Sequence, residues 1–164
     1  MSEDSPAGYG EGETMLERVR ALVHFTPLAV AMGIELTRVE RAKAWGKAPY
    51  KPEFVGDPDT GVIAGGVLTA FLDQVCGTAV VAAMDDPVII ATIDLRIDYM
   101  RPATPGRDVL AMAHCYKIGK SVAFVRAVAY EDDPENPIAH AVSAFMINSS
   151  GGRKFGANFK EPRK

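Results

Sequence analysis

The chain has little of what several large classes of protein need. It contains two cysteines, Cys76 and Cys115, which lie among apolar residues without C-x-x-C spacing. Neither a zinc site nor a disulfide framework is therefore expected, and a reducing compartment is favoured. Positive charge is also scarce, because the formal net charge is -3 and the pI about 5.6. A basic surface for nucleic acid is disfavoured, so any phosphate-bearing ligand has to be held locally.

Other signals are missing as well. Residues 1–13 carry four acidic residues and no apolar run, whereas a secretory signal has a cationic start and an apolar stretch, so we expect a cytoplasmic protein. There is no G-x-S-x-G elbow and no glycine-rich phosphate loop, and the three histidines are scattered without metal-ligand spacing. Serine and zinc hydrolases therefore lack support, and we expect neither a metal nor a separate cofactor.

The length of 164 residues, with 48% apolar residues, fits one globular domain. Residues 1–13 and 149–164 are polar and glycine-rich, which predicts two flexible tails around a body at 14–148. At the start of the body, Thr14 and Glu17 form a capping-box pattern before apolar residues at helical spacing. We therefore predict a short helix there. The next expected elements are a helical turn at 27–32, weak strands at 34–40 and 42–50, and a loop at 52–63.

The segment at 67–84 is apolar on every side, and only Asp73 and Gln74 are strongly polar within it. A carboxylate and an amide near the middle would be costly in lipid. The segment is therefore predicted to be a helix buried in the protein and covered all round.

Four strands are predicted after this helix. Apolar residues alternate with polar ones from Ala91 to Tyr99, which indicates a strand with one buried face. Further strands are expected at 108–116, 121–130 and 138–147, with turns between them. Short connections favour antiparallel pairing, so we predict a four-strand meander in a curved sheet around the helix, an α+β fold.

Asp73 is the sharpest chemical feature. Placing a carboxylate in apolar surroundings costs several kcal/mol unless it is paired or its pKa rises. One interpretation is a catalytic acid or base. The alternative is a structural Asp satisfied by a backbone or hydroxyl donor, or one that faces an oligomer groove.

Gly65 and Gly66 precede the helix, where unpaired N–H groups and the helix dipole suit an oxyanion. The alternative is a simple hinge. At about 1.5 Å per residue, Asp73 lies roughly 12 Å along the helix from Gly65, too far for both to reach one reacting carbon. Two antiparallel copies of the helix would bring them together, so we predict a two-fold dimer with composite sites.

Four segments together resemble one known family. The run Ala64–Asp73 (A-G-G-V-L-T-A-F-L-D), the strand end Tyr99–Pro102 (Y-M-R-P), the turn Gly119-Lys120 and the strand Ala139–Phe145 are similar to the hotdog-fold acyl-CoA thioesterases of the phenylacetate-degradation (PaaI-like) type. The resemblance covers about residues 30–148. It implies a hotdog fold, no metal, a coenzyme A thioester as substrate, and a homo-oligomer that is a dimer or a dimer of dimers.

The resemblance also implies roles for individual residues. Asp73 would be the catalytic carboxylate, acting as a base on water or attacking the thioester directly, and Gly65 the backbone donor to the oxyanion. A hydroxyl of Thr78 or Thr92 is expected to orient the carboxylate or the water. The residues expected to contact the substrate, with cations for the coenzyme A phosphates among them, are Gly66, Thr92, Arg101 and Lys120.

The sequence departs from the family pattern in two places. The motif histidine is Ala64, and the usual Asn or Gln about six residues earlier is replaced by Asp57-Pro58-Asp59. These departures leave a second hypothesis open, a non-catalytic protein that binds acyl-CoA or acyl groups.

Overall fold

The computed structural model of the chain describes residues 17, 19, 26–85 and 89–147. The tails predicted at 1–13 and 149–164 lie outside these residues. Of the helix predicted near the N-terminus, only Glu17 and Val19 are described; both are helical and Val19 is buried. Within this part of the chain no helix is long and apolar enough to cross a membrane.

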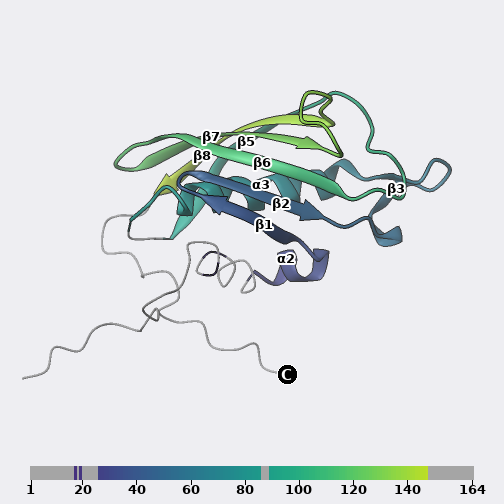
Figure 1. Ribbon diagram of the computed structural model, residues 1–164, viewed down its shortest axis with the longest axis horizontal. Coiled ribbons are helices and arrows are strands. Elements are labelled where there is room, and N and C mark those ends of the chain that lie inside the picture. The colour runs from purple at the N-terminus through teal and green to yellow at the C-terminus, as the bar shows by residue number, and fades with distance from the viewer. Residues whose placement is uncertain (1–16, 18, 20–25, 86–88, 148–164) are drawn as a thin grey trace, which may run out of the picture.

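Six antiparallel strands form one curved sheet that wraps a single long helix (Figure 1). In chain order the strands are β1 (Glu35–Glu40), β2 (Lys43–Ala48), β5 (Ile90–Tyr99), β6 (Val109–Ile118), β7 (Val122–Tyr130) and β8 (Ala139–Ile147). Their order in the sheet is β1-β2-β6-β7-β8-β5. The predicted α+β fold with a curved antiparallel sheet is confirmed.

The predicted four-strand meander is wrong in the position of β5. This strand pairs with β8 at one end of the sheet, whereas β2 takes the place beside β6. The connection from β5 to β6 contains Pro102, Pro105 and Gly106, the last with φ of +81°. Such a segment does not close as a tight hairpin, so β5 is free to cross to the other side of the sheet. The hairpins β6–β7 and β7–β8 form as predicted.

The central helix α3 spans Gly65–Val81. Its apolar side chains pack against the concave face of the sheet, and Phe71, Leu72 and Val75 are fully buried. The prediction that the helix is covered all round is wrong for the single chain, because one sheet covers only one side. Gly66 and Thr69 on the other side are exposed, and the buried fraction of the side chains rises only toward the C-terminal half of the helix.

The segment before α3 has more structure than the predicted loop. A 3-10 turn, η1 (Pro52–Phe54), leads into a two-stranded ribbon of β3 (Val55–Asp57) and β4 (Val62–Ile63). The Asp57 carboxylate closes the ribbon turn by accepting bonds from Thr60 Oγ1 at 2.6 Å and Asp59 N at 3.1 Å. The breaker residues therefore mark a tight turn inside a ribbon. Helix α2 (Pro27–Met32), predicted as a turn, ends at Gly33 with φ of +70°.

A β-bulge in β5 changes which residues face the helix. Thr92 pairs with Phe145, but the next pair is Asp94 with Ala144, so Ile93 has no partner in the ladder. Phe145 is buried on the helix side of the sheet, and Ile93 is 58% exposed. Strict alternation would put Thr92 on the polar outer face with Asp94. The extra residue instead turns Thr92 toward α3.

Candidate active site

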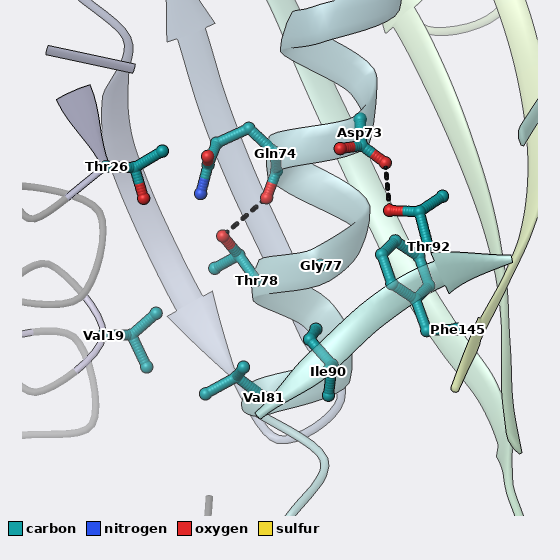
Figure 2. Close-up of a pocket in the computed structure, with 10 residues that line it drawn as sticks. All are labelled: Val19, Thr26, Asp73, Gln74, Gly77, Thr78, Val81, Ile90, Thr92 and Phe145. Atoms are coloured by element: carbon teal, nitrogen blue, oxygen red, sulfur yellow. Dashed lines mark hydrogen bonds between the residues drawn. The ribbon is translucent and has the colours of Figure 1, made fainter. Parts of the chain in front are cut away.

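A cavity of about 230 Å³ lies against α3 beside Asp73 (Figure 2). Its walls come from α3, from the start of β5, from β8 and from the chain ahead of α2. The lining residues are Val19, Thr26, Asp73, Gln74, Gly77, Thr78, Val81, Ile90, Thr92 and Phe145. Figure 2 shows polar side chains at the Asp73 end of this space and Val19, Val81 and Ile90 at the other end.

Asp73 is half-buried, and its carboxylate accepts a hydrogen bond from the neighbouring strand β5. Thr92 Oγ1 donates a hydrogen bond to Asp73 Oδ1 at 2.8 Å, as the dashed line in Figure 2 shows. The β5 bulge makes this bond possible because it directs Thr92 inward. One carboxylate oxygen is thus oriented by a hydroxyl, and the side chain borders open volume that can admit water or a ligand.

Of the two threonines considered for Asp73, Thr92 makes the contact. Thr78 Oγ1 donates instead to the carbonyl of Gln74 in its own helix, at 2.8 Å. Thr78 is 3% exposed and still lines the cavity, where its lone pairs remain acceptors for a ligand. Gln74 brings an amide to the same wall (Figure 2).

Cys76 lies in α3 but does not line the cavity beside Asp73. Its thiol is fully buried in the core beneath the helix, and burial raises its pKa to about 12. A thiol with so high a pKa is not a nucleophile near neutral pH. Cys76 is therefore a small buried hydrophobic residue of the core.

The glycine pair begins α3 next to a second cavity of about 280 Å³, whose walls include Gly65, Leu68, Tyr99 and Met100. The carbonyl of Gly65 accepts two hydrogen bonds, from Tyr99 Oη at 2.9 Å and from Thr69 Oγ1 at 3.1 Å. The two hydroxyls lie 3.0 Å apart. Since the Gly65 carbonyl and the Gly66 N–H belong to one planar peptide, these bonds fix the direction of that N–H as well.

Gly65 and Gly66 differ in the space that a side chain would find at each position. A Cβ on Gly65 would lie 3.3 Å from Tyr99 Oη, so the absence of a side chain lets the tyrosine approach closely. A Cβ on Gly66 would meet nothing within 4 Å. Packing within the chain therefore does not require glycine at position 66, and its backbone stays open to an approaching ligand.

Ala64, where the resemblance implies a histidine, joins the preceding turn to the helix start through its backbone. Its N–H donates to Phe54 O at 2.8 Å and its carbonyl accepts from Val67 N at 3.0 Å. The Cβ packs beside Gly56, where an added Cβ would come within 3.0 Å of it. The loop and the helix start thus stay in register without a histidine.

Asp73 and Gly65 line separate cavities of the single chain. This placement agrees with the distance expected along the helix, about 12 Å between positions 65 and 73. Strand β5 connects the two places, since Ile90 and Thr92 at its start line the first cavity and Tyr99 at its end lines the second.

Of the two predicted phosphate-binding cations, Arg101 is already engaged. Its guanidinium pairs with the buried Glu131 at 3.1 Å and also donates to the carbonyls of Pro102 and Asn136. Glu131 also accepts from both the backbone N–H and the hydroxyl of Thr104. Although burial acts to raise it, these bonds lower the pKa of Glu131. Lys120 is exposed in the β6–β7 turn.

Sequence reasoning did not identify several residues of these two cavities. The sequence places Tyr99 and Phe145 only in strands and in segments that resemble the family, and Gly77 only in the apolar helix. The sequence offered one signal for the bonds at the Gly65 carbonyl. Thr69 follows Gly65 by four residues, and a Thr hydroxyl in a helix readily bonds the carbonyl at i-4. Tyr99 and Phe145 come from β5 and β8, whose placement the sequence alone did not reveal.

Comparisons with known proteins agree with this architecture. Residues 60–138 match the family model described as the thioesterase superfamily. The medium/long-chain acyl-CoA thioesterase YigI of Salmonella typhimurium is 30% identical over 138 residues, which is 76% of this chain and 88% of that protein. A protein of Pseudomonas aeruginosa with a known crystal structure is 39% identical, with a TM-score of 0.74 over 81% of this chain and 98% of that one. The chain belongs to the thioesterase superfamily.

The predicted hotdog-fold thioesterase is thereby confirmed. The structure of a mutant of the phenylacetic acid degradation protein PaaI from Thermus thermophilus superposes with a TM-score of 0.65 over 74% of this chain and 98% of that one. At 20% identity this likeness shows the fold alone. In the described part of this thioesterase, no three His, Cys, Asp or Glu side chains are grouped so that they could hold a metal ion.

Proposed function

We propose that this thioesterase hydrolyses an acyl-CoA thioester, with Asp73 of one copy and the helix start of a second copy forming each active site. The observation that carries the proposal is the Asp73 carboxylate, oriented by Thr92 and bordering a cavity. Membership of the superfamily and the likeness to a medium/long-chain acyl-CoA thioesterase support the substrate class.

The chemistry follows from the groups present. The Asp73 carboxylate takes a proton from a water whose oxygen attacks the thioester carbon, while a backbone N–H of the glycine pair stabilises the oxyanion. The intermediate then collapses, the C–S bond breaks, and the coenzyme A thiolate receives the proton from Asp73. Direct attack by Asp73 to give an anhydride is the other route open to the same groups.

Two uncovered surfaces of the chain support the second copy. Within the described residues, the side of α3 that carries Gly66 and Thr69 is exposed, and β5 is an edge strand that pairs only with β8. Exposed edges usually pair or are protected. If two copies of β5 pair antiparallel about a two-fold axis, the Thr92 end of one lies by the Tyr99 end of the other. That arrangement brings each Asp73 cavity to the partner's glycine pair.

The coenzyme A phosphates need cations beyond the reacting groups. We propose Lys120 for this role, since it is exposed, and Arg101 as a second contact at the rim of the cavity that Gly65 also lines. Coenzyme A then enters as part of the substrate, and the reaction needs no separate cofactor.

Two variants test the proposal. Asp73→Asn keeps the shape of the side chain and removes the base, so we expect thiol release from octanoyl-CoA to fall by about 10²–10⁴-fold. Gly65→Pro removes the N–H at the first helical position, which tolerates proline, and the preceding Ala64 is extended with ψ of 139° as proline requires. We expect a loss of about 10²–10³-fold. Gly65→Ala, which adds a Cβ but keeps the N–H, is the matched control.

Mixing the two inactive variants tests the shared site. In a mixed dimer one site combines an intact Asp73 with an intact glycine pair, so random exchange should restore about a quarter of the wild-type activity. No recovery from a mixture shown to contain mixed dimers would contradict the shared site. Tight binding of octanoyl-CoA by the wild-type protein without any thiol release would instead identify a non-catalytic acyl-CoA binder, the alternative that Ala64 leaves open.

A further inference from the structure

Three residues of α3 form one stripe along the Asp73 cavity. Asp73, Gly77 and Val81 are spaced four residues apart, so they lie on the same face of the helix. All three line the cavity of about 230 Å³ (Figure 2). The stripe runs about 12 Å along the helix from the carboxylate to the valine. Gly77 lies between them and leaves this part of the wall without a side chain.

The fold of the chain does not require glycine at position 77. The described glycines with positive φ are Gly33, Gly61 and Gly106, so Gly77 has ordinary helical backbone. A Cβ there would lie 3.5 Å from Phe145 and 3.6 Å from Ile90, which is ordinary van der Waals contact. Alanine would therefore fit. Glycine in a helix interior is less favourable than any residue except proline, so the helix itself gains nothing from it.

The polarity of the cavity indicates what the lack of a side chain at position 77 does for a ligand. Near Asp73 the walls carry hydroxyl and amide groups, whereas Val19, Val81 and Ile90 make the far end apolar (Figure 2). A thioester carbon beside Asp73 would thus direct its acyl chain past Gly77 toward Val81. The volume exceeds the cavity of about 150 Å³ that holds a benzene molecule in another protein.

We infer that Gly77 is a specificity-determining residue that keeps this groove open for straight acyl chains of medium or greater length. The inference rests on the proposed thioesterase function and on Asp73 marking the reacting end. Each methylene that is buried past Gly77 raises kcat/KM by about fourfold, so the length of open groove sets the preference for longer chains.

A chain-length series measures this directly. Thiol release is followed with butanoyl-, octanoyl- and dodecanoyl-CoA for wild type, Gly77→Ala, Gly77→Leu and Val81→Ala. In Gly77→Leu the ratio of kcat/KM for dodecanoyl-CoA to that for butanoyl-CoA should fall by about 10- to 100-fold, because the leucine side chain occupies the groove that the longer chain needs. Gly77→Ala should shift the ratio in the same direction by a smaller factor. Val81→Ala, which lengthens the groove, should raise it.

The outcomes separate this inference from the function on which it rests. A wild-type protein that cleaves none of the three substrates overturns the proposed function and this inference with it. A wild-type enzyme whose Gly77→Leu and Gly77→Ala variants keep the wild-type ratio overturns the inference alone. Gly77→Ala should also raise the melting temperature, because alanine favours the helix. It therefore gives the answer even where Gly77→Leu fails to fold.

Discussion

The Thr92→Val substitution tests whether the hydrogen bond from Thr92 orients Asp73, the carboxylate that we propose as the catalytic base. The bond is 2.8 Å long and its acceptor is a half-buried carboxylate. Hydrogen bonds to charged groups contribute about 1.5–3 kcal/mol, and since Thr92 itself is exposed we take about 1–2 kcal/mol. If the transition state uses the whole of this energy, kcat falls by about 5- to 30-fold. The measurement is continuous thiol release from octanoyl-CoA.

Valine is the informative replacement because it keeps the β-branched shape and the pairing of position 92 with Phe145. Urea unfolding should confirm that the fold is intact. Thr92→Ser retains the hydroxyl and should recover most of the wild-type kcat. If Thr92→Val were fully active while Asp73→Asn was inactive, the carboxylate would work without this orientation and the reasoning would be refuted. Equal losses in the Ser and Val variants would assign the effect to shape.

Two further substitutions test the anchors around the site. Glu131→Gln should lower the free energy of unfolding at pH 7 by about 1–3 kcal/mol in urea titrations, since it weakens the bonds from Thr104 and Arg101. Because the pKa of Glu131 is lowered from about 4.5 by folding, its stabilisation is present above that pH and is lost as the pH falls through the lower folded value. The difference between Glu131→Gln and wild type should therefore shrink in acid, and a pH-independent difference would contradict this. Tyr99→Phe removes one of the two bonds to the Gly65 carbonyl and so loosens the peptide that carries the Gly66 N–H. If the Gly66 N–H assists the Gly65 N–H at the oxyanion, kcat should fall by about 3- to 10-fold with KM little changed. A rise in KM at constant kcat would show that the Gly66 N–H binds the substrate without stabilising the oxyanion.

Much of the secondary structure was predictable because local patterns decide it. The apolar run after Gly66 gave a helix, α3, and the alternating segments gave β5 to β8 within one or two residues at most ends. The hairpins β6–β7 and β7–β8 followed from their short turns. These features depend on neighbours in the sequence, which a single chain displays directly.

The pairing partners of each strand were harder to predict from the sequence. Nothing local shows that β5 pairs with β8 and leaves the place beside β6 to β2. The bulge at Ile93 is equally hidden, because the apolar and polar residues alternate straight through it. Yet the bulge decides that Thr92, and not an outward-facing residue, meets Asp73.

The candidate site was also predictable only in part, because distances within one segment followed from the sequence whereas contacts between segments did not. The sequence by itself determined that an acid lies eight residues after the first of two helix-opening glycines, and so that the two lie too far apart to act together within one chain. Only the tertiary structure decided that Thr92 bonds to the acid, that Tyr99 bonds to the Gly65 carbonyl, and that Gly77 lines the same cavity as Asp73. The physical reason is that helix geometry fixes distances within one segment, whereas contacts between segments depend on strand order and register, which are set by the packing of the whole sheet against the helix.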